Sequence, residues 1–304
     1  MFLPNSLKEK IYELTEGISP AQLREASEEI TSIYRKQKSL ARKEALLAYL
    51  VVRLPATYGA TKQVLTEAAS FCTPASLLDL GGGPGTTSWA AREIWGENLA
   101  VTSIEKHPSF IELGKALQSP TDWLCEDVTH LSTFPPHDLI VYGYSFGELN
   151  EPNLLSLAWE AASQGVILVE PGTPAGYQNI LKARDHLIEL GGFVAAPCPH
   201  NHPCPLSPPD WCHFAARISR SQLHMVAKEG SLPFEDEKYS YLIVLKKSLS
   251  HNSSRILRPP DKKKGHIELS LCTPQGTNTL LTLTKRKDRE RYSQARKASW
   301  GSTI

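Results

Sequence analysis

The chain has 304 residues, of which 41% are hydrophobic, so it can bury a large core in one or two domains. Its longest apolar run, residues 45–52, is far shorter than the roughly 20 residues of a transmembrane helix, so we expect no membrane span. The formal net charge of +1 is unevenly spread, because residues 246–304 hold 14 Lys and Arg against 4 Asp and Glu, a net +10, which leaves −9 for residues 1–245.

The N-terminal sequence and the cysteines bear on the compartment. The first residues, MFLPNSLKEKIYELTEGISP, lack the basic-then-apolar order of a secretion signal and carry glutamates that transit peptides avoid, so we expect no cleaved leader. Six cysteines in a chain of this size are expected to be free thiols in a reducing compartment. We therefore expect a cytoplasmic protein that is a monomer when free.

Three zones follow one another along the chain. Residues 1–70 are predicted to be helical, since Ser19 followed by Pro20 is typical of a helix start. Residues 71–247 are predicted to form an α/β domain with a parallel sheet covered on both faces, because short apolar runs alternate with helix-like stretches. These runs are residues 77–80, 99–104, 139–142, 166–169, 213–218 and 241–245. Residues 248–304 are predicted to be a small basic β extension, in which Ile267, Leu269 and Leu271 alternate with polar residues.

A glycine-rich turn follows the first predicted strand, in the segment LLDLGGGPGTTSWAA (residues 77–91). This order of strand, turn and helix places a ligand at the carboxyl end of the strand, although a tight turn without a ligand is the alternative. The dinucleotide fingerprint Gly-x-Gly-x-x-Gly fails, because Thr86 stands where its third glycine belongs. The run Asp79-x-Gly81-x-Gly83-x-Gly85 instead resembles that of S-adenosylmethionine-dependent methyltransferases. That resemblance assigns Asp79 to the charged amino-acid end of the cofactor.

Further acids are predicted around the same cofactor. Glu105 ends the second predicted strand, 20 residues after Gly85, as expected for a carboxylate that binds the ribose hydroxyls. Glu126 and Asp127 stand where this superfamily often places an acid near the adenine. A carboxylate at a strand end is about as often a solvated loop residue.

The sequence does not identify a catalytic residue for methyl transfer. The segment VYGYSFGELNE lacks the Asn/Asp-Pro-Pro-aromatic run of methyltransferases that act on base amines. Ser145, Glu148 and Asn150 flank the presumed methyl site but suit turns and caps equally well. Cys198 is a poor candidate for the nucleophile of a cytosine-carbon methyltransferase, because it belongs to a tight set of cysteines. Both an enzyme and a binding protein therefore stay open.

Three cysteines lie within 15 residues in a proline-rich loop, residues 197–213, which contains PCPHNHPCPL and DWCH. Such a set, formed by Cys198, Cys204 and Cys212, predicts a metal site, whereas Cys72 and Cys125 stand alone and are predicted to be small buried hydrophobes. Two metals fit this loop. Zinc would take three thiolates and one imidazole, from His200, His202 or His213. An iron–sulfur cluster would need a fourth thiolate, for which Cys272 is the candidate.

Two basic blocks, residues 261–264 and 285–287, stand in the C-terminal zone. Either block alone is as often a solvated turn. Both blocks in one segment, with further arginines and the aromatic residues Tyr292 and Trp300, favour a nucleic-acid phosphate backbone as partner.

From about residue 40 to the end, the chain resembles the methyltransferase-like small ribosomal subunit assembly proteins, which have bacterial members and mitochondrial relatives. The segments that carry this resemblance are AYLVVRLPATYGA, LLDLGGGPGTT, YSFGELN, VEPGTPAGY, APCPHNHPCPL, DWCHF, GHIELSLCTPQG and YSQARKASWG. The resemblance implies a class I, Rossmann-like methyltransferase fold with an N-terminal helical region, a cysteine-rich loop insertion and a small C-terminal β extension. It also implies a 4Fe–4S cluster on Cys198, Cys204, Cys212 and Cys272, and association with the small ribosomal subunit and its rRNA. rRNA is then the expected substrate if the chain is an active methyltransferase.

Overall fold

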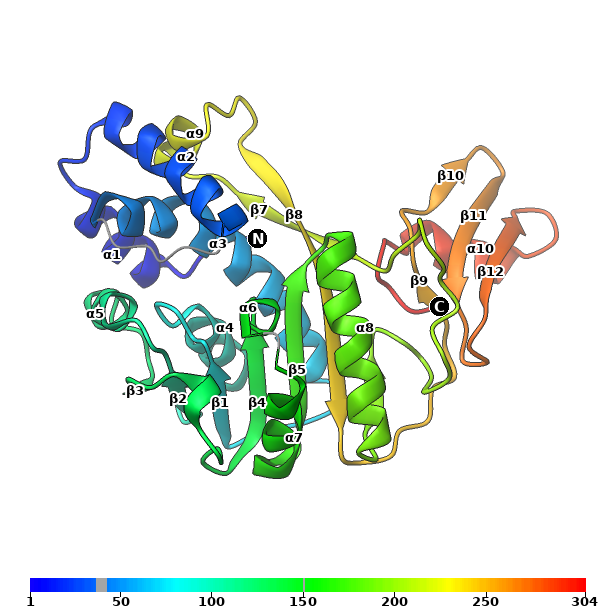
Figure 1. Ribbon diagram of the computed structural model, residues 1–304. Coiled ribbons are helices and arrows are strands. Elements are labelled where there is room, and N and C mark those ends of the chain that lie inside the picture. The colour runs from blue at the N-terminus through cyan, green and yellow to red at the C-terminus, as the bar shows by residue number, and fades with distance from the viewer. Residues whose placement is uncertain (37–42, 150) are drawn as a thin grey trace.

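A mixed sheet of eight strands forms the centre of the computed structural model, which describes residues 1–36, 43–149 and 151–304 (Figure 1). The strand order is β3-β2-β1-β4-β5-β8-β6, and β7 pairs with β8. The strands are β1 (Ser76–Leu80), β2 (Ala100–Ile104), β3 (Asp122–Leu124), β4 (His137–Gly143), β5 (Ala162–Pro171), β6 (Phe193–Ala196), β7 (Phe214–Ser219) and β8 (Phe234–Leu245).

The sheet has the topology of a Rossmann-like class I methyltransferase, as predicted. Strands β3, β2, β1, β4 and β5 are parallel, as expected. The prediction of a parallel sheet is wrong for β8, which runs antiparallel to β5, β6 and β7. The chain turns from β1 to β2 on one side and later returns to β4 on the other, so the strand order reverses beside the carboxyl end of β1. Ligands of open α/β sheets bind at this switch point. The glycine turn stands there.

Helices cover both faces of the sheet because buried strand residues alternate between them (Figure 1). Leu139 and Val141 of β4 pack with α3 and α4 residues, whereas Ile140 and Tyr142 pack with α7 and α8 residues. The helices of this part are α4 (Thr86–Trp95), α5 (Pro108–Ala116), α6 (Phe146–Leu149), α7 (Pro152–Ala161) and α8 (Pro174–Glu189), with a 3-10 turn η1 (Val128–His130). No helix in the described ranges is long and apolar enough to cross a membrane.

The N-terminal helices α1 (Asn5–Thr15), α2 (Pro20–Lys36) and α3 (Lys43–Ala68) pack with α9 (Gln222–Ala227) into a cap above the sheet (Figure 1). Helix α2 begins where the sequence predicts, because the Gln22 amide donates to the Ser19 hydroxyl (3.2 Å) and the Ser19 amide donates to Gln22 Oε1 (3.0 Å). Helix α3 is buried along most of its length and runs from the cap down to the sheet. The cap and the sheet therefore share one helix.

The C-terminal unit consists of β9 (Arg255–Ile256), β10 (Asp261–Lys263), β11 (His266–Cys272), β12 (Asn278–Thr284) and the helix α10 (Arg289–Lys297). Its small core contains Ile267, Leu269 and Leu283, and Tyr292 of α10 packs against it. The predicted strands are present, whereas α10 is an addition to the prediction. The buried Arg255 side chain links the unit to the rest of the chain through the Pro197 carbonyl (2.9 Å) and the Glu67 carboxylate of α3.

Candidate functional site

The glycine turn between β1 and α4 requires glycine for two reasons. Gly81, Gly83 and Gly85 have φ values of +74°, +53° and +82°, which side chains of L-residues rarely permit. A Cβ on Gly81 would also lie 2.7 Å from Ser145 Cβ. At Gly83, by contrast, the nearest atom to an added Cβ is the Tyr49 hydroxyl at 3.9 Å. The turn is therefore tightly packed at Gly81 and open at Gly83. The backbone of Gly83 is accessible to a ligand.

Glu105 lies beside this turn at the carboxyl end of β2. Its Oε2 accepts a hydrogen bond from the Gly83 amide (2.9 Å), and its Oε1 accepts one from the His107 amide (2.9 Å). The side chain is only 6% exposed but lines the cleft above the turn. The Glu105 carboxylate thus holds the turn in place, and it lies on the side where the ribose of the cofactor is predicted to bind.

Asp79 has a different environment from the one that its proposed role implies. Its side chain is fully buried beneath the turn, and the residues that line the cleft do not include it. Neither carboxylate oxygen has a hydrogen-bond partner of normal geometry among the described residues, and Oδ2 lies 2.9 Å from where a Gly82 Cβ would stand. Burial raises the pKa of Asp79 to about 7, although the nearby Thr87 hydroxyl lowers it somewhat.

A cleft of about 1000 Å³ opens above the glycine turn. Its floor consists of the turn and the carboxyl ends of β2, β4 and β5, and its roof is the cap. One stripe of α3 faces it at a spacing of four residues: Tyr49, Arg53, Thr57 and Thr61. This stripe was not predicted from the sequence, although four polar or amphipathic residues at helical spacing in an apolar segment were a usable signal.

Glu126 and Asp127 line the end of the cleft beyond Glu105. Asp127 also caps η1, because its Oδ1 accepts a hydrogen bond from the Thr129 amide (3.0 Å). The Thr129 hydroxyl is the main cause that lowers the pKa of Asp127, and Lys106 lies 3.7 Å from its Oδ2. Glu126 is exposed. The structure thus brings both acids to the cleft, with Asp127 partly committed to a turn.

Two polar residues follow β4 at the opposite end of the cleft. Tyr144 has φ +64°, a conformation that costs energy for a bulky residue and is enriched at functional sites. Its hydroxyl donates to Glu237 Oε1 (3.3 Å). The Ser145 hydroxyl donates to the Leu80 carbonyl and thereby ties this segment to the glycine turn.

Two glutamates line the same end. Burial raises the pKa of Glu170 to about 7, and its two oxygens accept hydrogen bonds from the Gly147 amide (3.1 Å) and the Asn179 side chain (3.2 Å). The cleft walls also raise the pKa of Glu148, and Glu105 raises it further, although the Glu148 side chain reaches solvent. Asn150, the third residue predicted here, lies outside the described residues.

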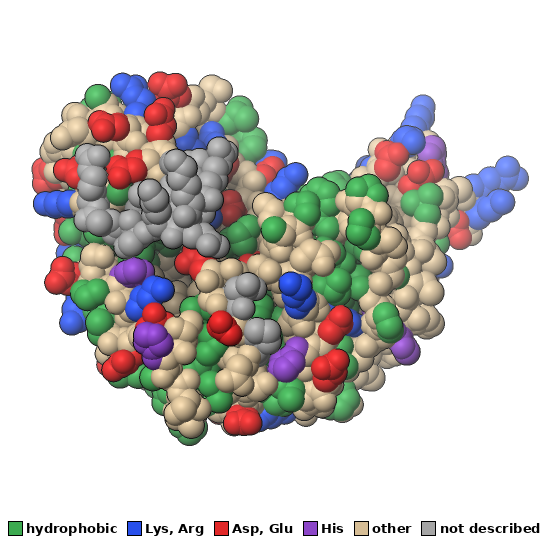
Figure 2. Space-filling view, in the orientation of Figure 1, with side chains coloured by type: hydrophobic (Ala, Val, Ile, Leu, Met, Phe, Trp, Pro, Cys, Tyr) green, Lys and Arg blue, Asp and Glu red, His purple; other side chains and the backbone are tan. Residues whose placement is uncertain are grey.

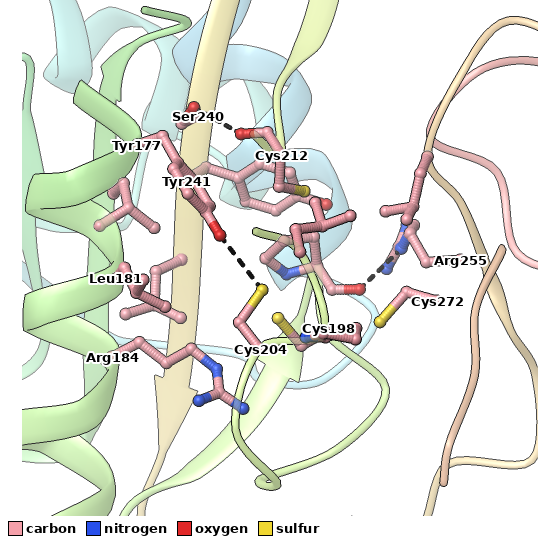
Figure 3. Close-up of a pocket in the computed structure, with 16 residues that line it drawn as sticks. Tyr177, Leu181, Arg184, Cys198, Cys204, Cys212, Ser240, Tyr241, Arg255 and Cys272 are labelled. Atoms are coloured by element: carbon pink, nitrogen blue, oxygen red, sulfur yellow. Dashed lines mark hydrogen bonds between the residues drawn. The ribbon is translucent and has the colours of Figure 1, made fainter. Parts of the chain in front are cut away.

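A second cavity contains all four cysteines that the sequence analysis singles out: Cys198, Cys204, Cys212 and Cys272 (Figure 3). It lies between α8, β8 and the C-terminal unit, and much of its wall is apolar. The Tyr177 hydroxyl lies 3.2 Å from the Cys204 sulfur, and His200 Nε2 lies 3.2 Å from the Cys272 sulfur. Residues from three separate segments therefore meet in one place.

Buried thiols and two positively charged arginines, Arg184 and Arg255, line this cavity. Burial raises the pKa of Cys212 well above its usual value and that of Cys272 to about 12, and the neighbouring thiols add to both effects. Two arginines that line the cavity lower the pKa of Cys272. One of them, Arg184, donates to the His200 carbonyl (3.0 Å), but its buried Nε has no partner among the described residues.

The four thiols surround a hollow and do not converge on a point. In the ranges that the structure describes, no three His, Cys, Asp or Glu side chains are placed to hold a single metal ion. The hollow measures about 30 Å³, against roughly 10–15 Å³ for one water. Of the two solitary cysteines, Cys72 is half-buried and Cys125 is exposed, so the prediction of a buried hydrophobe is wrong for Cys125, which follows the short edge strand β3.

Two curated proteins illustrate the relationships of the chain. The human ribosome assembly protein METTL17, mitochondrial, is 27% identical over 85% of this chain and 62% of its own length. The Saccharomyces cerevisiae ribosome assembly protein RSM22, mitochondrial, is 22% identical over 45% of this chain and 38% of its own length. The chain thus spans less than two thirds of the length of either relative.

Among solved structures, the plantazolicin methyltransferase BpumL in complex with SAH aligns with 79% of this chain and 99% of its own, at 13% identity and a TM-score of 0.42. The sequence profile of a family described as mitochondrial small ribosomal subunit Rsm22 matches residues 43–304. This stretch includes the glycine turn and all four cysteines of the second cavity, and on this match the chain belongs to that family.

Proposed function

We propose that the chain binds S-adenosylmethionine and a 4Fe–4S cluster, and acts on or with the small ribosomal subunit and its rRNA during assembly or translation. The observation that carries the cofactor part is the open backbone of Gly83 beneath a cleft of about 1000 Å³ at the switch point of the sheet. The ribosomal part rests on family membership over residues 43–304.

The cleft suits S-adenosylmethionine. The glycine turn offers close backbone approach, and Glu105 lies where a carboxylate would take the ribose hydroxyls. Glu126 and Asp127 are assigned to the adenine end. The bound cofactor would supply an electrophilic methyl group. The contribution of the chain to transfer would be to position an acceptor in line with that methyl group inside the cleft.

The observation that supports a metal centre in the second cavity is that four cysteines line it together, and four thiolates are the usual ligand set of an iron–sulfur cluster. An iron–sulfur cluster is larger than one ion and carries negative charge, which Arg184 and Arg255 would offset. The unpartnered Arg184 Nε is a donor for which a sulfide would be an acceptor. Ligation by Cys198, Cys204, Cys212 and Cys272 would leave no open iron, so its role would be structural or sensory. Zinc held by three thiolates and a histidine such as His200 is the alternative.

Metal analysis tests this assignment. The full chain, purified without oxygen, is expected to contain iron and acid-labile sulfide in equal amounts near four per chain and to be brown. Cys272→Ser is expected to lose most of both, whereas Cys125→Ser, which removes an exposed thiol, keeps them. One zinc per chain without sulfide would refute the cluster and support a zinc site of three thiolates and a histidine. Full iron retention in Cys272→Ser would remove Cys272 from the ligand set.

The fold supports rRNA as partner by joining the two basic blocks. Residues 262–264 enter the β10–β11 turn and residues 285–287 follow β12, and the antiparallel pairing of β11 with β12 brings these ends together. The Lys285 amide donates to the Gly265 carbonyl (2.9 Å) across the junction. Figure 2 shows Lys and Arg side chains at the outer tips of this unit, and all six basic side chains are exposed. We expect RNA affinity to fall steeply with salt, and a flat dependence would remove this unit from the RNA site.

A second candidate, a non-catalytic rRNA-binding assembly factor, is favoured by the polar groups at the methyl end of the cleft. Tyr144, Ser145 and Glu170 all use their polar groups there in hydrogen bonds within the protein. Gly83→Ile separates the two roles, since a side chain there would block the cofactor. If small-subunit assembly in cells survives the loss of cofactor binding, the enzyme role is excluded. If assembly fails in step with binding, an occupied cofactor site is required for assembly, and the enzyme role stands.

We further propose a monomer when free, in a reducing compartment with its ribosomal target. None of the six cysteines forms a disulfide, which is typical of such a compartment. The names of the two relatives place those proteins in mitochondria.

A further inference from the structure

We propose that Arg53 binds the carboxylate of the methionine moiety of the cofactor and thereby selects ligands that carry an amino-acid end. This inference rests on the proposed S-adenosylmethionine site and adds a residue of the cap to it. Arg53 stands on the cleft-facing stripe of α3, one turn after Tyr49. Because the Tyr49 hydroxyl lies 3.9 Å from the Cβ position of Gly83, this stripe passes directly over the glycine turn.

The contacts of Arg53 place it toward β4. Its guanidinium approaches Glu237 Oε1 at 3.7 Å, and the same oxygen accepts a hydrogen bond from Tyr144, the residue after β4. Arg53 also lowers the pKa of both Tyr49 and Tyr144, so its charge acts on groups over the turn and at the end of β4. Glu105 lies at the end of β2, and β1 separates β2 from β4. A cofactor with its ribose at Glu105 therefore extends its methionine moiety across the turn toward Arg53.

The residues that line the cleft are more acidic than basic, so a ligand carboxylate needs a cation beside it. The described lining residues include five acids, Glu105, Glu126, Asp127, Glu148 and Glu170, and three cations, Arg53, Lys106 and Lys228. Each of the three is paired with an acid, but in a different place: Lys106 with Asp127 at the adenine end (3.7 Å) and Lys228 with Glu235 in the cap (3.3 Å). Arg53 pairs with Glu237 beside Tyr144 (3.7 Å), so it is the cation on the β4 side of the turn. A ligand carboxylate would be repelled by the acids unless a guanidinium faces it, and a guanidinium matches a carboxylate in shape and charge.

The test compares two ligands that differ by this end. S-adenosylhomocysteine has the amino-acid moiety, and 5′-methylthioadenosine lacks it but keeps the nucleoside and the sulfur. Isothermal titration of the full chain would measure both affinities. We expect Arg53→Gln to weaken S-adenosylhomocysteine by about tenfold or more, the usual loss for a charge-assisted pair, and to leave methylthioadenosine within about twofold. Arg53→Lys should keep part of the preference. The matched control Lys106→Gln, at the nucleoside end, should change both affinities by the same factor.

The outcomes separate this inference from the proposed function. If the wild-type chain binds neither ligand, the cofactor assignment fails and Arg53 has no ligand to select. If the wild-type chain binds S-adenosylhomocysteine and Arg53→Gln binds it equally well, the role of Arg53 is refuted and the cofactor assignment stands. If Arg53→Gln weakens both ligands by one factor, Arg53 only shapes the cap, and the inference is refuted.

Discussion

Asp79 is expected to make the stability of the cofactor-free protein fall as the pH rises. The carboxyl group is fully buried, and its pKa of about 7 compares with an ordinary value of 3.8. Because the folded state binds this proton more tightly than the unfolded state, the stabilising contribution is complete below pH 3.8 and is lost as the pH rises toward 7. At about 1.4 kcal/mol per pKa unit, the ionised carboxylate costs roughly 4 kcal/mol above pH 7, and more than half of this cost develops between pH 5 and pH 8.

Asp79→Asn removes this ionisation with little change of shape. The free energy of unfolding of this variant is measured by urea denaturation without cofactor. Relative to that of the wild type, it is expected to rise by roughly 2–3 kcal/mol from pH 5 to pH 8. Asp122→Asn is the control, because it makes the same substitution at an exposed residue of the same sheet. A difference between Asp79→Asn and wild type that is constant over this range would refute a buried carboxyl group with a raised pKa.

Three further variants test packing and charge elsewhere. Glu235→Gln should destabilise the cap by about 2 kcal/mol at pH 7 in urea unfolding. Burial raises the pKa of Glu235, but His224, 3.3 Å away, and Arg220, which donates to Glu235 Oε2 (2.8 Å), outweigh burial and hold this pKa well below its usual value. The loss of stability in the variant should therefore shrink as acid protonates the wild-type carboxylate, and an equal loss at all pH values would contradict this. Leu269→Ala should cost about 2–4 kcal/mol within the C-terminal core, against under about 0.5 kcal/mol for the exposed Leu280→Ala; equal melting temperatures would contradict the packing described. Gly81→Val should lower the melting temperature and abolish cofactor binding by titration, since Gly81 combines φ +74° with a crowded Cβ position, and normal binding would show that the turn adapts.

The main strands could be predicted because each has a continuous apolar run. The two short strands β3 and β6 could not: Asp122–Leu124 is three residues at a half-polar edge, and Phe193–Ala196 is too short to show a period. Helix α10 was hidden by its composition, since Tyr292 and Ala295 are its buried residues and charged side chains cover the rest. In β3, β6 and α10, contacts with neighbouring elements determine the structure more than the local pattern of apolar residues does.

Some parts of the candidate site could also be predicted from the sequence, and others could not. Chain spacing was enough to bring Glu105 and the glycine turn together, because consecutive parallel strands end at one edge. The burial of Asp79 follows from strand alternation, which puts it on the same face as Leu77, against α3 and α4. The stripe of α3 could not be assigned to the cleft, since no local pattern says which helix covers it. The meeting of Cys272 with the cysteine loop is likewise a long-range event, which was expected from resemblance alone.

Helix α8 is a wall common to both cavities. Residues before and in its first turns, Thr173, Gly176 and Asn179, face the cleft, whereas Tyr177, Leu181 and Arg184 face the thiols. A rotation of this helix about its axis that tightened one cavity would displace side chains in the other. The two cavities therefore share one structural element, and we expect amide hydrogen exchange along α8 to respond to a ligand in either cavity.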